Sequence, residues 1–264
     1  MSKLVEVEKK GEIAILTLQN PDNFNPLNLE TGTELLEAIE NLRDENNIRC
    51  LIITGSGKAF SAGGDVKKFK ESAENGTAGK VMDDLTKVLY KIALVLRQYP
   101  KPVIAAVNGW AVGAGMNLAL SCDFIIASEY GKFRQSFCKL ALIPGFAGTI
   151  FLSRQLTWQQ AVQMSFFGET YSAKEMKELG FVNEIVAADQ LKEAAIKWAE
   201  KFASGPPLTY ARTKILFFEA LNTPFETHLE NERQMQIKSA ESEDYKIGVT
   251  AITVSYTHLT LPTN

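Results

Sequence analysis

The sequence has few of the residues on which many functional sites are built. Among 264 residues there are only three cysteines and two histidines. The cysteines (Cys50, Cys122 and Cys138) lie in apolar runs and do not have the spacing of metal ligands. An odd number of cysteines without such spacing argues against both a disulfide framework and a zinc site. We therefore expect no metal, and buried free thiols in a reducing compartment, namely the cytoplasm.

An excess of positive charge is also missing. The formal net charge is −3, which gives no reason to expect a nucleic-acid partner. No signal peptide is expected, because Met1-Ser-Lys3 leads directly into an alternating strand pattern. Residues 102–122 carry no charge and are long enough to span a membrane, but Asn108, Gly113 and Asn117 interrupt them. We interpret this stretch as buried core and expect no membrane partner.

Two phosphate-binding signatures are absent as well. Lys58 follows too short a loop and precedes alanine, so the sequence contains no G-x-x-x-x-G-K-[ST] motif. No G-x-G-x-x-G follows the two apolar strands predicted at 50–54 and 103–107. The usual nucleotide-binding classes are therefore not indicated.

Hydrophobic periodicity predicts alternating strands and helices, followed by helices alone. The predicted strands are 4–8, 13–18, 50–54, 103–107, 123–127, 132–137 and 181–186. The predicted helices are 31–43, 81–98, 158–167, 172–179, 191–203, 207–221 and 225–240. Thr31 and Thr33 are candidate caps of the first helix, and the polar segment 67–79 is expected to be mobile. This pattern is typical of an α/β fold with a helical C-terminal part.

Two glycine-rich turns are the main chemical feature. One, at 55–65, follows the strand at 50–54, and the other, at 108–115, follows the strand at 103–107 and opens into a helix. Such a turn leaves backbone N–H groups unpaired and pointing one way, ready for a phosphate or an oxyanion. The alternative is that the glycines only let helix and strand pack closely.

Taken together, these motifs resemble a known superfamily. The segments Ala59-Phe-Ser-Ala-Gly-Gly-Asp65, Lys101–Gly109, Gly113-Ala-Gly115, Cys122-Asp123, Ile143-Pro-Gly145 and Gly148-Thr149 resemble the crotonase (enoyl-CoA hydratase/isomerase) superfamily in order and spacing. The resemblance covers about residues 3–251. It implies a spiral of ββα units over residues 1–200, a C-terminal helical region over 201–253, and a homotrimer or dimer of trimers. Residues 254–264 have neither helical periodicity nor family likeness, and we interpret them as a non-native tail.

The resemblance also implies a binding site for an acyl-CoA thioester. The backbone N–H groups of Gly64 and Ala114 would form the oxyanion hole for a thioester enolate. The adenine and pantetheine of coenzyme A would lie along a segment made of Ala62, Gly63, Asp65, Val66 and Lys67. Lys67 would meet a phosphate, or would simply be a solvated surface lysine. Coenzyme A would enter as part of the substrate, and no separate cofactor is expected.

The general acid/base carboxylates of the superfamily are missing. The positions that hold them in hydratases correspond to Asn117 and Phe137, and the position used by some isomerases corresponds to Gly145. Phe137 would instead line the substrate pocket. Asp65 is a candidate base, although by resemblance it holds its turn; Asp123 is expected to be structural. His228 is expected to be solvated or to lie on a trimer face.

These observations favour an enzyme of fatty acid metabolism, a lyase or isomerase of the enoyl-CoA hydratase/isomerase type, with a non-standard proton carrier. One variant needs no carboxylate base, because decarboxylation of a malonyl- or glutaconyl-type thioester generates the enolate directly. The alternative is a catalytically silent crotonase-like protein that binds acyl-CoA. The empty carboxylate positions favour the silent protein, and the intact glycine turns favour the enzyme.

Overall fold

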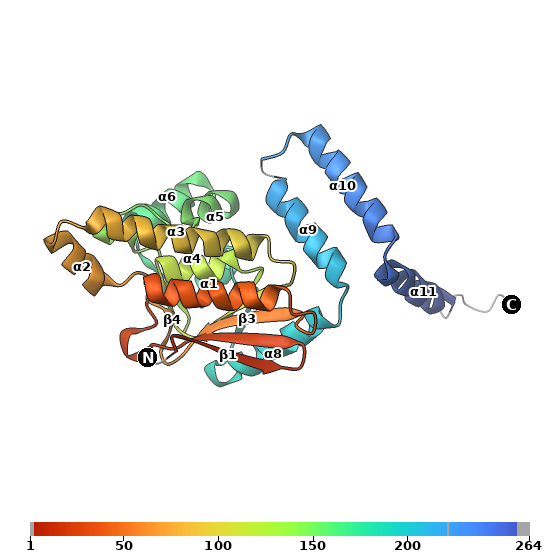
Figure 1. Cartoon of the computed structure of the whole chain (residues 1–264), viewed down its shortest axis with the longest axis horizontal. Helices are drawn as coiled ribbons and strands as arrows, with labels where there is room; N and C mark the ends of the chain where they lie inside the picture. Colours follow the sequence, from red (N-terminus) through yellow and green to blue (C-terminus); the bar gives the residue numbers. More distant parts are fainter. Residues whose placement is uncertain (1–2, 221, 258–264) are drawn as a thin grey trace.

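The computed structural model describes residues 3–220 and 222–257, and its largest element is a six-stranded sheet (Figure 1). The strand order is β1-β2-β3-β5-β7-β10. β1 pairs antiparallel with β2, and the remaining neighbours are parallel. These strands are β1 (Val5–Lys10), β2 (Ile13–Leu18), β3 (Cys50–Gly55), β5 (Val103–Val107), β7 (Phe124–Ser128) and β10 (Glu184–Val186).

A second, four-stranded sheet runs in the order β4-β6-β8-β9. Its strands are β4 (Ala59–Ser61), β6 (Trp110–Val112), β8 (Lys132–Arg134) and β9 (Thr170–Ser172), of which only β9 pairs antiparallel. Strands that follow one another in the chain alternate between the two sheets, as in β3 and β4, β5 and β6, and β7 and β8. This alternation is the ββα spiral that the sequence predicted.

Helices cover both faces of the six-stranded sheet. Ile13 and Ile15 of β2 pack towards α8 (Leu191–Ala203), whereas Ala14 and Leu16 face the main core, to which α1 (Leu29–Arg43) and α3 (Ala78–Arg97) contribute. A strand buried on both faces has no polar side to show, which explains the continuous apolar runs in the sequence. Within the described residues, no helix is both long and apolar enough to cross a membrane.

Helix α4 (Ala114–Ser121) is buried along its whole length. Together with β5 and β6 it accounts for the uncharged run at 102–122, which is core as predicted. Its first turn packs on the end of β4: a Cβ added at Gly115 would lie only 2.3 Å from the carbonyl oxygen of Ser61. Glycine is therefore required here for the close approach of helix and strand.

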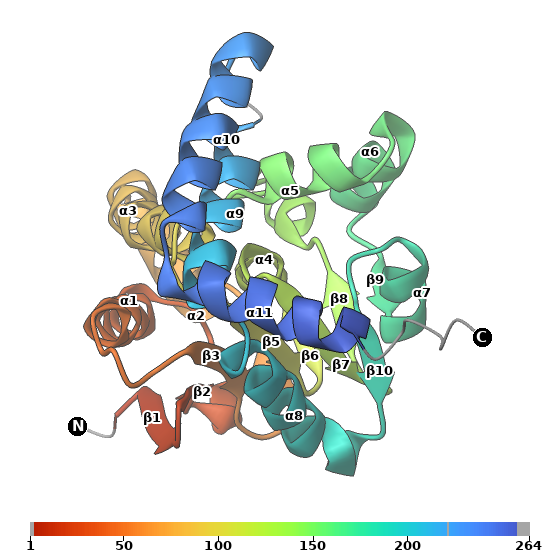
Figure 2. The ribbon, with the colours of Figure 1, turned by 90° about the vertical axis from the view of Figure 1, so that its right-hand side faces the viewer.

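Three helices form a C-terminal arm that leaves the core after α8 (Figures 1 and 2): α9 (Pro207–Glu219), α10 (Phe225–Ala240) and α11 (Glu243–Thr257). Lys214 of α9 attaches the arm through an ion pair with Asp123, in which Nζ and Oδ2 are 2.5 Å apart. Burial lowers the pKa of Lys214. Asp123 also accepts the backbone N–H of Val103 at 2.9 Å, so its predicted structural role is confirmed.

The remaining helices are α2 (Val66–Glu74), α5 (Gly148–Gln155), α6 (Trp158–Phe167) and α7 (Ala173–Glu178), with short 3-10 helices at Pro21–Asn23, Phe137–Leu140 and Ala188–Gln190. The helices predicted at 158–167, 191–203 and 225–240 have the predicted bounds. The polar segment at 67–79, predicted to be mobile, is instead mostly helical. Asp65 caps the N-terminus of this helix and so helps to start it. The prediction rested on the polar composition of the segment and did not take this cap into account.

Other predictions were wrong in detail. The cap of α1 is Asn28, whose side chain accepts the N–H of Thr31, and neither predicted threonine serves. Phe137 lies in a 3-10 helix and not on a strand, because β8 ends at Arg134. Cys138 is half-buried and not fully buried like Cys50 and Cys122. Helix α11 extends through Thr257, into the segment predicted to lack helix, and residues 258–264 lie outside the described residues.

The contact between α4 and β4 predicts that two glycine-to-alanine substitutions change the free energy of unfolding differently. Gly115→Ala forces the added Cβ against the Ser61 carbonyl, so we expect destabilisation of about 1–3 kcal/mol. Gly79→Ala, in the first turn of α3 with nothing within 4 Å of the added Cβ, should be neutral or stabilise by about 0.4–1 kcal/mol. Thermal unfolding of both variants measures the difference, and equal melting temperatures would contradict the packing described.

Candidate active site

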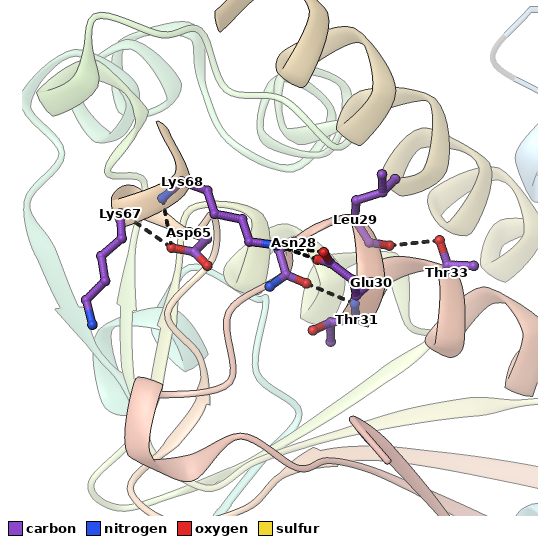
Figure 3. Close-up of polar contacts among 8 residues, drawn as sticks. All are labelled: Asn28, Leu29, Glu30, Thr31, Thr33, Asp65, Lys67 and Lys68. Carbon is purple, nitrogen blue, oxygen red and sulfur yellow. Dashed lines mark hydrogen bonds and ion pairs between the residues drawn. The ribbon is translucent and has the colours of Figure 1, made fainter. Parts of the chain in front are cut away.

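The first glycine turn joins β4 to α2 through Ala62, Gly63 and Gly64. It is held by Asp65, the N-cap of α2, whose Oδ1 accepts the backbone N–H groups of Lys67 and Lys68 at 3.1 and 3.2 Å (Figure 3). Of the two roles considered for Asp65, the structure thus supports that of holding the turn.

The second turn joins β6 to α4 through Gly113, which has φ of +52° and donates its N–H to the carbonyl of Arg134 at 2.7 Å. Because β4 and β6 are parallel neighbours, their carboxyl ends meet at one edge of the sheet. The two turns are in direct contact there: a Cβ added at Gly63 would lie 2.3 Å from the Val112 carbonyl oxygen and 3.1 Å from the Ala114 nitrogen. Gly63 has φ of +81°, so both space and backbone angle require glycine.

The two turns leave backbone N–H groups without an acceptor at this contact. Ala62 donates to the Phe24 carbonyl at 2.8 Å, and Gly63 donates to Ser61 Oγ at 3.1 Å. Gly64 and Ala114, the next donors in the two turns, have no hydrogen-bond acceptor among the described residues. Both were predicted as donors from the sequence, and the fold brings their turns together. Paired free donors of this kind can bind an oxygen that carries negative charge.

The side chain of Asn117 is fully buried one turn into α4. Its Nδ2 donates to the Gly145 carbonyl at 2.7 Å, and its Oδ1 accepts Gln135 Nε2 at 2.6 Å. Gly148 packs on the same amide, since a Cβ there would lie 2.3 Å from Asn117 Nδ2. Asn117 is therefore fixed in a buried amide network.

Phe137 and Gly145 stand next to this network. A Cβ added at Gly145 would lie 3.6 Å from Phe137 Cε1 and 3.4 Å from the hydroxyl of Tyr90 on α3. The structure therefore brings together all three positions that were predicted to lack a carboxylate: Asn117, Phe137 and Gly145. Sequence reasoning missed Gln135 and Tyr90, because a polar residue near a strand end and an aromatic residue in an amphipathic helix carry no distinctive signal.

The outer rim of the first turn is charged. Lys68 forms an ion pair with Glu30 of α1, with Nζ 2.7 Å from each carboxylate oxygen, and this tie connects α1 with α2 (Figure 3). The hydrogen bond from Lys68 holds the pKa of Glu30 below its usual value. Val66 and Lys67 are exposed, and the side chain of Lys67 points away from this pair (Figure 3). A phosphate contact by Lys67 stays a prediction.

A cavity of about 1120 Å³ lies between α3, α5 and α9. Tyr90, Pro144 and Ala147 border it on the side of Gly145, and apolar residues such as Phe151 and Phe217 line its interior. The guanidinium of Arg97 stacks on the Phe151 ring, 4.5 Å from its centroid, and burial lowers its pKa. The cavity thus begins beside the amide network and extends under the C-terminal arm.

The structure also locates His228 and bears on metal binding. His228 lies on α10 of the arm, with its Nε2 3.4 Å from Glu232 and its side chain only 13% exposed, so it is not solvated. Within residues 3–220 and 222–257, no three His, Cys, Asp or Glu side chains gather as a possible metal site.

Comparison with known proteins agrees with this geometry. The enoyl-CoA hydratase/isomerase family matches residues 8–253. A short-chain-enoyl-CoA hydratase of Clostridium acetobutylicum is 34% identical over 249 residues, covering 94% of this chain and 93% of that protein. A 1,2-epoxyphenylacetyl-CoA isomerase of Escherichia coli is 34% identical over 243 residues, covering 92% of each. The crystal structure of an enoyl-CoA hydratase from Polaromonas sp. JS666 matches with a TM-score of 0.91 and 31% identity, covering 95% of this chain and 97% of that one.

The overall fold is thus shared with a solved structure of an enoyl-CoA hydratase. The chain belongs to the enoyl-CoA hydratase/isomerase family.

The amide network around Asn117 predicts an effect on stability. Asn117→Ala would leave the Gly145 carbonyl and the Gln135 amide without their partners in the core, which costs about 1–3 kcal/mol. We expect the melting temperature to fall by roughly 2–4 °C for each kcal/mol lost. Asn41→Ala, on the exposed side of α1, is the control and should leave the melting temperature unchanged. An unaltered melting temperature for Asn117→Ala would contradict the network.

Proposed function

We propose that this protein is an acyl-CoA enzyme of the hydratase/isomerase type, in which the N–H groups of Gly64 and Ala114 stabilise a thioester enolate. The observation that carries the proposal is the pair of unpaired N–H donors at the contact of the two turns. Removal of one such donor costs roughly 3–4 kcal/mol of transition-state stabilisation in a comparable enzyme. Both donors are backbone N–H groups, so glycine at residue 64 and alanine at residue 114 can each supply one.

The coenzyme A portion would lie along the first turn. Ala62, Gly63, Asp65 and Val66 would line its adenine and pantetheine, and the exposed Lys67 would meet a phosphate. Coenzyme A enters with the substrate, and the proposal requires no other cofactor. The cavity next to Tyr90 offers apolar space of the size that ligand pockets have.

The buried state of Asn117 favours one particular reaction as a second candidate. A side chain locked between Gly145 and Gln135 cannot remove a proton, and the other two positions offer no base. Decarboxylation of a malonyl- or glutaconyl-type thioester needs no such base, because loss of CO₂ forms the enolate directly. A catalytically silent acyl-CoA binding protein is the other alternative, and turnover of any thioester would exclude it.

We also propose a homotrimer, or a dimer of trimers, in the cytoplasm. The C-terminal arm supports self-association, because it exposes large apolar side chains along its helices: Phe217, Phe225, Leu229, Ile247 and Ile252. Exposed apolar surface of this kind marks an interaction site in a protein that is not membrane-bound. The thiols of Cys50 and Cys122 are free and buried, which fits a reducing compartment.

Coenzyme A thioesters should bind with a Kd in the micromolar range, about −8 kcal/mol. Isothermal titration calorimetry with acetyl-CoA and crotonyl-CoA measures this. Lys67→Ala should weaken binding several-fold through the lost phosphate contact, whereas Lys177→Ala, an exposed lysine on α7, should not. The absence of heat at millimolar thioester would rule out coenzyme A as the ligand, and equal affinity of the two variants would remove Lys67 from the site.

Gly145→Asp should restore an isomerase carboxylate. An added Cβ there meets Tyr90 and Phe137 at ordinary contact distances, and the backbone is not in the left-handed region, so aspartate can be accommodated. We expect conversion of 3-hexenoyl-CoA into the conjugated 2-enoyl thioester to rise, because a positioned general base contributes roughly 10²–10⁴-fold. The absorbance of the conjugated product follows the reaction. Gly145→Asn is the matched control, because it has the same shape without the charge, and equal rates for both variants would argue against a base at this position.

A further inference from the structure

Tyr90 presents a free hydroxyl beside the position where a catalytic carboxylate is missing. It lies on α3 and is 47% exposed, and its hydroxyl makes no hydrogen bond within the described part of the chain. Its hydroxyl oxygen lies 3.4 Å, and its Cε1 3.8 Å, from where a Cβ at residue 145 would be. A side chain at residue 145 would therefore point at this hydroxyl, and in its absence Tyr90 supplies the polar group in that space.

The ring of Phe137 lies between the surroundings of Gly145, where Tyr90 stands, and those of Gly113. The ring of Phe137 has Cε1 3.6 Å from the Cβ position at Gly145, and its Cε2 3.6 Å from that at Gly113. Gly113 immediately precedes Ala114, whose N–H is unpaired. The hydroxyl and the Ala114 amide thus border one region, with the aromatic ring of Phe137 between them.

Two hydroxyl groups border this region, that of Tyr90 and that of Ser136, whose Oγ lies 3.2 Å from the Cβ position at Gly113. A phenol is a far stronger acid than an aliphatic alcohol, so Tyr90 is the better proton donor. Phe137 and Gly145 have no acidic proton, and the amide of Asn117 is engaged on both sides. Asp65 caps α2 through its carboxylate. Tyr90 also borders the large cavity and is partly exposed, so its hydroxyl can exchange its proton with solvent.

We propose that Tyr90 is a catalytic residue that protonates the thioester enolate, an assignment that rests on the proposed function. The enolate α-carbon takes the proton of the hydroxyl, so a C–H bond forms and the O–H bond breaks. The electron pair of the O–H bond remains on the phenolate, which then takes a proton from water and leaves hydroxide. Transfer in this direction is favourable, because a phenol is a far stronger acid than the α-C–H of a thioester. Protonation of the enolate at its α-carbon completes both hydration and decarboxylation.

Tyr90→Phe tests the assignment, because it removes the hydroxyl and keeps the ring. Wild-type protein is first assayed with crotonyl-CoA and malonyl-CoA, both of whose reactions end with protonation of the α-carbon, and the thioester that is turned over is used for the variants. We expect kcat to fall by about 100-fold or more, within the range of roughly 10²–10⁴ for a general acid. KM should change by no more than about twofold, since binding does not depend on the hydroxyl. Tyr130→Phe, with a 66% exposed ring in the turn between β7 and β8, is the control and should keep the wild-type kcat.

A binding measurement tests the same contact without turnover. Calorimetry gives the ratio of the Kd of coenzyme A to that of acetoacetyl-CoA, whose acyl group readily forms an enolate. This ratio is the preference for acetoacetyl-CoA over coenzyme A. Tyr90→Phe should lower the preference about tenfold and leave the affinity for coenzyme A unchanged, whereas Tyr130→Phe should alter neither. A wild-type kcat in Tyr90→Phe, or an unchanged preference where no probe is turned over, overturns the assignment and leaves the proposed function standing. Failure of the wild-type protein to bind either compound overturns both.

Discussion

The reciprocal contact between the two glycine turns is the constraint on which the rest of the site depends. Gly63 of the first turn lies against the Val112 carbonyl of the second, and Gly115 of the second lies against the Ser61 carbonyl of the first. Either position would place a Cβ 2.3 Å from an oxygen atom. The parallel pairing of β4 and β6 sets the two turns at the same edge, and the missing side chains let their backbones meet.

Under the proposed function, the backbone amides of Gly64 and Ala114 are the principal functional groups of the site. Among the side chains around them, Phe137 is apolar and the amide of Asn117 is occupied by Gly145 and Gln135. A site of this kind stabilises developing negative charge on an oxygen atom without relying on an ionised carboxylate. Its proton chemistry must then come from a neutral group or from the substrate, which distinguishes it from a site with two glutamates.

The sequence predicted the larger elements because their cause is local. The strand at 103–107 and the helices at 158–167 and 191–203 have the predicted bounds, since their apolar periodicity reports directly on burial. Strands β4 and β6 were missed because three residues carry too little pattern, although the glycine turns that follow them were found. The strand predicted at 132–137 was too long, because the 3-10 helix that takes in Phe137 is set by packing against Gly113 and Gly145. Tyr90 and Gln135 could not be found for the same reason: contacts distant in the sequence bring them to the site.

The central claim is that the Gly64 and Ala114 amides hold the thioester carbonyl oxygen. Isotope-edited infrared difference spectroscopy of bound crotonyl-CoA, labelled with ¹³C at the carbonyl, reports on that oxygen directly. Two hydrogen bonds from the backbone would polarise the C=O bond, so the account predicts that the labelled carbonyl stretch moves to lower frequency on binding. A stretch at the frequency of free crotonyl-CoA, with the ligand bound, would contradict it.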